Sequence, residues 1–417
     1  MDISLFHTFS IVVALAATFS YINHRFLKLP TTIGLMILAL CLAGIMILTG
    51  KFSNEFFVET CKVVHVIDFR LLLMDIMLSF LLFAGALHVN AQSLKSERLP
   101  VFLFATFGVV LSTFLVGTGV YWLLNGLSLN ISYTYCLLFG ALISPTDPIA
   151  VLSILKEFRV SESLETKISG ESLFNDGVGV VVFLSILMAN ETGIENFSIG
   201  ETMTLLAEEA LGGLLFGGVL GYGGYLILRT VTDSAKIEVL VTIAITMGGY
   251  ALASLIHVSG PLAMVVAGLI IGNKILATDK TTKAGEQLSD FWEMLDESLN
   301  AVLFVLIGLE VISLPYENIY LLAGVLAIFI VLLSRVISVA IPVVLIQKNV
   351  KEKARSTIAI LTWGGLRGGI SIALALSLPQ SEYRDLIVLI TYVVVVFSII
   401  FQGLSIGALV KKLKLGV

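Results

Sequence analysis

Thirteen apolar runs dominate the sequence, and they strongly restrict what it can fold into. A transmembrane helix needs about 20 apolar residues to cross a hydrocarbon core about 30 Å thick. Charged residues make up only 13% of the 417, and the mean hydropathy is +1.01, which a soluble fold could not accommodate. We therefore expect an all-α polytopic membrane protein with about 13 transmembrane helices. The runs lie at about residues 4–22, 30–50, 71–89, 99–125, 131–155, 167–189, 203–228, 237–256, 259–273, 291–313, 317–346, 356–378 and 385–410.

Lys and Arg residues are distributed unequally between alternate loops. Of the 25, 19 lie in one set of loops and the C-terminal tail, four lie in the other set, and two lie within runs. Cytoplasmic loops carry the excess of basic residues, so the N-terminus is expected outside and the C-terminus in the cytoplasm. The predicted location is the cell (inner) membrane, with lipids around a multi-pass chain.

The sequence shows no motif for a cofactor. A Gly-Lys-Ser/Thr phosphate-binding loop is absent, and few residues follow the last run, so neither ATP-driven transport nor a soluble regulatory domain is expected. The three cysteines and five histidines are scattered, without the spacing of metal ligands or of a disulfide framework. We expect residues 1–417 to form a single transmembrane unit that uses ion gradients, with no enzymatic activity and no nucleic-acid partner.

Two of the runs contain residues that interrupt a helix. Residues 144–148 read Ser-Pro-Thr-Asp-Pro, and the two prolines remove backbone donors and clash with preceding carbonyls. Residues 363–369 read Trp-Gly-Gly-Leu-Arg-Gly-Gly, and glycines weaken a helix locally. These are the fifth and twelfth runs, which cross in opposite directions, as inverted-topology repeats of runs 1–6 and 8–13 require. Paired interruptions of this kind point to a transporter's binding site at the midplane.

Four ionisable residues lie at a similar depth in these runs: Asp147, Glu171, Asp176 and Arg367. A charge near the bilayer centre costs roughly 2.5–3.5 kcal/mol on insertion scales, so packing alone does not account for four of them. Glu171 and Asp176 point about 140° apart on a helical wheel, so they are expected to do different jobs. We expect Arg367 to pair with Glu171, and Asp147 to lie near the positive ends of half-helices.

Asp176 is then left without a fixed partner. A lone buried carboxylate must take up a proton or a cation, and competition between the two at one site is the chemistry of an antiporter. Another polar group begins the tenth run, and for it we favour a solvated helix start over a cytoplasmic cation funnel. Its members are Asp290, Glu293, Asp296, Glu297 and Asn300. No role follows for Arg335, and Glu310 is interpreted as interfacial.

These motifs resemble the sodium/proton antiporters of the monovalent cation:proton antiporter-1 family. The matching segments are Thr146-Asp147-Pro148, Gly-Glu-Ser-Leu-Phe-Asn-Asp-Gly at 170–177 and Gly-Gly-Leu-Arg-Gly-Gly at 364–369. The resemblance covers essentially the whole membrane chain. It implies that Asp176 carries the proton or the Na⁺, that Thr146 and Ser172 help to bind Na⁺, and that Glu171 and Arg367 form a structural ion pair. Asp147 is grouped with the ion-binding residues, and Asn175 implies electroneutral exchange of one ion for one proton.

The resemblance also implies a homodimer in which one domain of each protomer moves against the other. A six-helix transport domain, roughly 99–189 and 317–410, would move as an alternating-access elevator against a dimerisation domain, roughly 1–95 and 203–313. One departure concerns the third run, where several prokaryotic members carry an acid in a Phe-Glu-Ala-Ala-Leu context. Here residues 83–87 read Phe-Ala-Gly-Ala-Leu, with Ala84 in place of the acid, so ion affinity or selectivity is expected to differ.

The sequence thus predicts a secondary transporter that exchanges Na⁺, and also Li⁺ or K⁺, for H⁺. A K⁺/H⁺ antiporter of the same fold is an alternative. From other classes, a passive cation channel and a non-transporting sensor stay open. An intramembrane aspartyl protease is disfavoured, because Leu-Phe-Asn precedes Asp176 where such enzymes carry Gly-x-Gly.

Overall fold

The computed structural model describes residues 5–50, 71–192, 199–231, 234–276, 283–314, 317–346 and 351–415. Within these ranges the regular structure is helical, and an isolated β-bridge joins Asp147 to Leu366. Eight helical segments in the described chain are long and apolar enough to cross a membrane, and three shorter apolar helices accompany them. The predicted all-α polytopic class is confirmed.

The first half of the chain forms α1 (Leu5–Ile22), η1 (Asn23–Leu27), α2 (Thr31–Gly50), η2 (Leu71–Met77), α4 (Leu78–Leu87), α5 (Ala91–Ser96), α6 (Arg98–Phe102), η3 (Leu103–Gly108), α7 (Val109–Gly126), α8 (Tyr133–Ile143), α9 (Ile149–Glu157) and α10 (Glu162–Thr192). The second half forms α11 (Ile199–Leu228), α12 (Ala235–Leu255), α13 (Gly260–Ile271), η5 (Gly272–Leu276), α15 (Lys283–Glu310), η6 (Val311–Ser313), α16 (Asn318–Ile346), α17 (Lys351–Trp363), α18 (Gly369–Leu376), α19 (Arg384–Phe397), η7 (Ser398–Gln402) and α20 (Gly403–Lys412). Each of the 13 predicted runs coincides with one of these helices or with a continuous or interrupted series of them.

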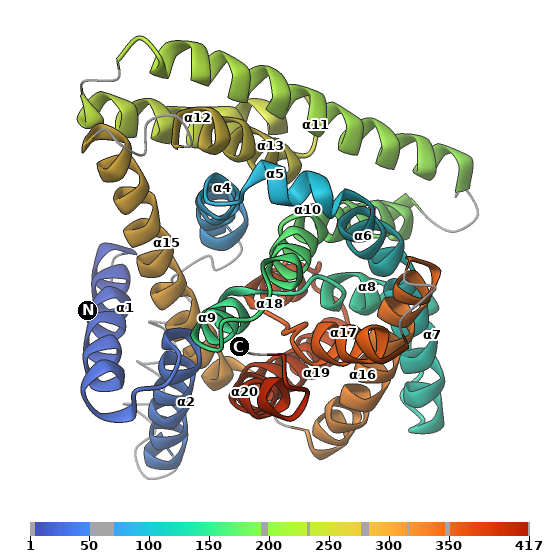
Figure 1. The fold of residues 1–417 in the computed structure, drawn as a ribbon. Helices are drawn as coiled ribbons and strands as arrows, with labels where there is room; N and C mark the ends of the chain where they lie inside the picture. The colour runs from blue at the N-terminus through green and yellow to red at the C-terminus, as the bar shows by residue number, and fades with distance from the viewer. Residues whose placement is uncertain are drawn as a thin grey trace.

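The helices form two groups by their packing. In one group, α7 packs against α8 and α16, α16 against α17 and α19, and α10 against α8. In the other, α11 packs against α13, α13 against α4, and α15 against α1, α2, α4 and α12. Figure 1 shows α11–α13, α15, α1 and α2 along two sides of the first group. Contacts between the groups include those of α10 with α4, α11 and α13, and of α18 with α15.

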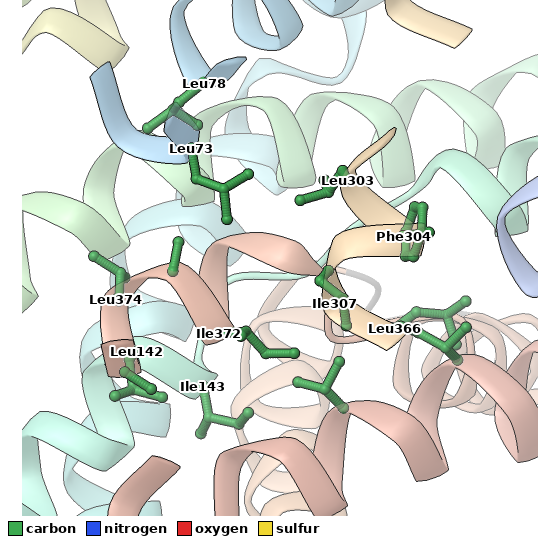
Figure 2. Close-up of a cluster of buried hydrophobic side chains, with 14 of the residues drawn as sticks. Leu73, Leu78, Leu142, Ile143, Leu303, Phe304, Ile307, Leu366, Ile372 and Leu374 are labelled. Atoms are coloured by element: carbon green, nitrogen blue, oxygen red, sulfur yellow. The ribbon is translucent and has the colours of Figure 1, made fainter. Parts of the chain in front are cut away.

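A layer of buried apolar side chains lies where α15 and α18 meet the helices around them (Figure 2). Side chains packed this closely leave little room for water or ions between them. We call this set the apolar layer. It contains Leu73, Leu78, Leu142, Ile143, Leu303, Phe304, Ile307, Leu366, Ile372 and Leu374.

Candidate functional site

The two interrupted helices meet at their unwound segments. The first break separates α8 from α9 over residues 144–148, and the second separates α17 from α18 over residues 364–368. The backbone N–H of Asp147 donates to the carbonyl of Leu366 at 2.8 Å, which forms a single antiparallel bridge between the two breaks. Both interruptions were predicted, and both are confirmed. We call this meeting point the crossing.

Glycine at position 368 permits this close approach. A Cβ atom placed there would lie 2.6 Å from the Cβ atom of Asp147, which is closer than real Cβ atoms approach. The glycines of the second break therefore do more than weaken the helix, because they let one unwound chain lie directly against the other.

Charged side chains at the crossing complement the ends of the half-helices. The Asp147 carboxylate accepts a hydrogen bond from the N–H of Ile149 at 2.9 Å, at the N-terminal end of α9. The Arg367 guanidinium donates through Nη1 to the carbonyls of Ser144 at 2.5 Å and Pro145 at 3.1 Å, just beyond the C-terminal end of α8. An acid at the start of a helix and a cation at its end both oppose the helix dipole. The predicted position of Asp147 near a half-helix N-terminus agrees with this geometry.

The buried acid Glu171 pairs with a different arginine from the one predicted. Its Oε1 atom lies 2.5 Å from Nη1 of Arg335 on α16, and these side chains are only 2% and 7% exposed. Arg335 also donates to the carbonyl of Leu361 from Nε at 3.2 Å and Nη2 at 3.1 Å, and a side chain at Gly365 would collide with its guanidinium. The predicted pair Glu171–Arg367 is therefore corrected, because the unwound carbonyls after α8 engage Arg367 and leave Glu171 to Arg335.

Three neutral polar residues hold the first break against α10: Thr146 of the break, and Ser172 and Asn175 of the helix. The side-chain amide of Asn175 donates to Oγ1 of Thr146 at 2.8 Å, and its Oδ1 accepts from the N–H of Thr146 at 3.4 Å. The hydroxyls of Thr146 and Ser172 lie 3.3 Å apart. Asn175 is fully buried and does not line the cavity beside the crossing, so it holds the Thr146 side chain from the side away from that cavity.

A cavity of about 720 Å³ lies beside the crossing. Thr146 and Asp147 of the first break line it, together with one face of α10 from the first turn of that helix to its middle. Leu78 and Leu303 line it too, and both belong to the apolar layer, so the cavity ends against that layer. The α10 residues that line it are Glu162, Glu165, Thr166, Ser169, Ser172, Leu173 and Asp176.

Asp176 is distinguished from the other ionisable residues of the crossing by its lack of a partner. Its carboxylate has no hydrogen bond or ion pair to any described residue, and the nearby charge of Asp147 repels it. Glu171, Arg335, Arg367 and Asp147 all have the partners given above. Among the ionisable residues of the crossing, Asp176 is therefore the carboxylate that is free to bind a proton or a cation.

The opposite wall of the cavity is formed by α15, whose polar residues fit the interpretation as a solvated helix start only in part. Glu293, Asp296, Glu297 and Asn300 line the cavity, and Asn300 is only 4% exposed. Of the five polar residues named at the start of this helix, Asp290 lies outside the lining, Glu293 and Glu297 are exposed as a solvated helix start requires, and Asp296 and Asn300 are more buried. Spacings of three and four residues place the other four on one helical face, a signal compatible with both interpretations. Ser371 of α18 also lines the cavity and was not identified from the sequence.

The cavity offers hydroxyl, amide and carboxylate oxygens as possible ligands. Within the ranges that the structure describes, no group of three His, Cys, Asp or Glu side chains is arranged to hold a metal ion. The oxygens of Thr146, Ser172 and Asp176 are nevertheless of the kind that hard cations prefer. A weakly held cation passing through the cavity suits them better than a resident metal.

Comparison with known proteins agrees with this geometry. The profile of the family described as "Sodium/hydrogen exchanger, transmembrane" matches residues 12–412. The chain is 46% identical over 409 residues to the Na(+)/H(+) antiporter NhaP of Pseudomonas aeruginosa, covering 97% of this chain and 96% of that protein. It is 35% identical to the Na(+)/H(+) antiporter NhaH of Halobacillus dabanensis, covering 93% of each chain. In structure it is similar to the sodium proton antiporter MjNhaP1 from Methanocaldococcus jannaschii at pH 8, with a TM-score of 0.73, 19% identity and 98% of both chains covered. A profile match over nearly the whole length, together with full-length relatives above 30% identity, means that the chain belongs to the sodium/hydrogen exchanger family.

Proposed function

We propose that this protein exchanges Na⁺ for H⁺ across the membrane and that Asp176 is the shared site. The observation that carries the proposal is the unpaired Asp176 carboxylate in the cavity, beside a crossing whose other charges are engaged. Relatives that match over most of their length are named Na(+)/H(+) antiporters. The family consists of secondary transporters, so the protein is not an enzyme and the intramembrane protease is excluded.

The cation would be held by oxygens from both elements of the crossing. Thr146 and Ser172 supply hydroxyls, Asp176 supplies the charge, and Asp147 lies close enough to add to the negative potential. Asn175 would act by fixing the Thr146 hydroxyl rather than by contacting the ion. A proton on Asp176 removes the charge that holds Na⁺, so one occupant excludes the other. This exclusion couples the two flows.

The packing of the helices supports a division into a moving and a static part. The helices of residues 99–189 and 317–410 pack mainly among themselves, as do those of residues 1–95 and 203–313. We assign the first set as a transport domain and the second as the dimerisation domain of a homodimer in the inner membrane. With the N-terminus outside, the cavity lined by Asn90, Lys156 and Glu162 opens to the cytoplasm and is closed from the outside by the apolar layer.

The test is a dequenching assay in proteoliposomes that hold a proton gradient. Addition of Na⁺ should collapse the gradient, Li⁺ should substitute for it, and a comparison with K⁺ separates the Na⁺/H⁺ antiporter from the K⁺/H⁺ alternative. A cation flux that proceeds without counter-movement of protons would identify a passive channel. Absence of any flux from folded protein would favour a sensor.

The same vesicles test stoichiometry. Asn175 is neutral, so we propose that one Na⁺ exchanges for one proton and that no net charge moves. Exchange rates should then be insensitive to an imposed membrane potential. Acceleration under one polarity would show that a second group, Asp147 first, carries another proton.

A further inference from the structure

The α15 wall carries features that the exchange site at Asp176 does not use. Asp296 and Asn300 lie one turn apart on the face of α15 that lines the cavity. The Nδ2 of Asn300 donates to the backbone carbonyl of Asp296 at 2.9 Å, which directs its Oδ1 atom elsewhere. Glu293 and Glu297 are exposed and lie on the same face, Glu293 one turn before Asp296 and Glu297 directly after it.

Two buried oxygens on this side of the cavity have no hydrogen-bond partner among the described residues. They are Oδ1 of Asn300 and Oγ of Ser371, in residues that are 4% and 1% exposed, and both residues line the cavity. Buried polar atoms are nearly always satisfied, and leaving one unsatisfied destabilises the fold. Two unsatisfied oxygens that line one cavity indicate a ligand that is coordinated by oxygen atoms, as a cation is.

Packing brings the helices that carry these two oxygens into contact. Leu303 of α15 lies against Gly369 at the start of α18, where a Cβ atom would be 2.8 Å from the Leu303 methyl carbons. Asn300 is about one turn before Leu303 on α15, Ser371 belongs to the first turn of α18, and both residues line the same cavity. Asp296 is near enough to Asp147 for their charges to interact across the cavity. A cation between them would relieve that repulsion.

We propose a second monovalent-cation site on this wall, formed by the Asp296 carboxylate, Oδ1 of Asn300 and Oγ of Ser371. One carboxylate with two neutral oxygens balances a single positive charge, which matches Na⁺ in chemistry and in charge. The site rests on the proposed function, because the same ion would wait here before it reaches Asp176. It lies between the two helix groups, and its α15 ligands belong to the wall that the dimerisation domain provides.

The experiment separates this site from the exchange site by using binding and transport together. Na⁺-specific thermal stabilisation is measured on the full-length protein in detergent, with choline replacing Na⁺ at constant ionic strength, since a ligand that binds only the folded state raises its stability. Asp176→Asn should retain part of the Na⁺-specific shift, and the further change Asp296→Asn should remove it. Asp290→Asn is the matched control, because it removes the same charge from the same helix outside the cavity lining.

In proteoliposomes, Asp296→Asn should raise the KM for Na⁺ about tenfold with little change in maximal rate, as expected for loss of one charged ligand. This effect should persist in high choline chloride. Glu293→Gln should raise KM only at low ionic strength, because salt screens an exposed charge. A KM for Asp296→Asn that equals wild type, or returns to it in high salt, would overturn the site and leave the exchange function intact.

Other outcomes are equally decisive. If Asp296→Asn fails to fold, Asn300→Ala and Ser371→Ala each remove one neutral oxygen, and wild-type KM in both would overturn the proposal. If the Na⁺-specific shift vanishes entirely in Asp176→Asn, a separate site on α15 is excluded. Exchange that survives in Asp176→Asn would instead contradict Asp176 as the shared site of the proposed function, and the thermal shifts would still report on α15.

Discussion

The two faces of α10 carry an acid each, and their surroundings differ completely. On one face, Glu171 is held by Arg335, and Asn175 is held by Thr146. On the other, Asp176 faces a cavity and has no hydrogen bond or ion pair to a described residue. Fixed partners make the first face rigid and costly to disturb, whereas an unpaired carboxylate can change its occupant at little structural cost. A single helix thereby combines a structural face with a functional one.

The largest effect is expected on the cavity face. Asp176→Asn should abolish Na⁺-dependent proton flux, since an amide can neither release a proton nor balance a cation. Thermal unfolding in detergent should stay close to wild type, because no partner is lost. Retained flux at wild-type protein levels would contradict the assignment of Asp176 and turn attention to Asp147.

The next effect is on the structural face. Glu171→Ala strands the Arg335 guanidinium in a dry interior, which typically destabilises a protein by about 3–5 kcal/mol. Unfolding in detergent is the measurement, with the exposed Glu157→Ala as control. The double change Glu171→Ala with Arg335→Met should recover most of the loss, because both charges are then removed. If Arg367→Met recovers the stability lost in Glu171→Ala and Arg335→Met does not, Glu171 pairs with Arg367, contrary to the structure.

The third prediction follows from the competition at the cavity face. Below the pH at which Asp176 titrates, the proton must leave before Na⁺ binds, so the KM for Na⁺ should rise roughly tenfold per pH unit, or about 1.4 kcal/mol. The maximal rate should change little. A KM that stays constant while the maximal rate falls on acidification would mean that protons act at another group. Proteoliposome kinetics over a series of pH values provide the test.

The smallest effect is expected where the two faces meet. Asn175→Ala removes the hydrogen bond that orients the Thr146 hydroxyl, and one such bond is worth about 0.5–1.5 kcal/mol, so KM for Na⁺ should rise about fivefold. Ser169→Ala is the control, since it lies on the cavity face of α10 and the α10 hydroxyl that lies beside Thr146 is that of Ser172. Equal effects of the two changes would show that Asn175 does not act through Thr146.

Much of this architecture could be predicted because it depends on local properties of the chain. Apolar run length predicted the membrane helices, and Pro145, Pro148 and the glycines at 364–369 predicted the two breaks. Helical spacing separated Glu171 from the face of Ser172 and Asp176 before any contact was known. The resemblance to a known family then supplied roles for Thr146 and Asn175 that spacing alone did not provide.

The side-chain partners that lie on different helices could not be predicted from the sequence. Arg335 and Arg367 both lie within membrane runs, and counting charges could not decide which of them pairs with Glu171. The carbonyls of Ser144 and Pro145 bind the Arg367 guanidinium only because the two breaks cross in the folded protein. The role of the polar face of α15 likewise depended on whether water or another helix group faces it. The sequence by itself determined which segments span the membrane, where they break and which residues share a helical face, since these follow from length and periodicity. Only the tertiary structure decided that Glu171 pairs with Arg335 and that Asp296 and Asn300 face the crossing, because long-range contacts between helices leave no local pattern in the chain.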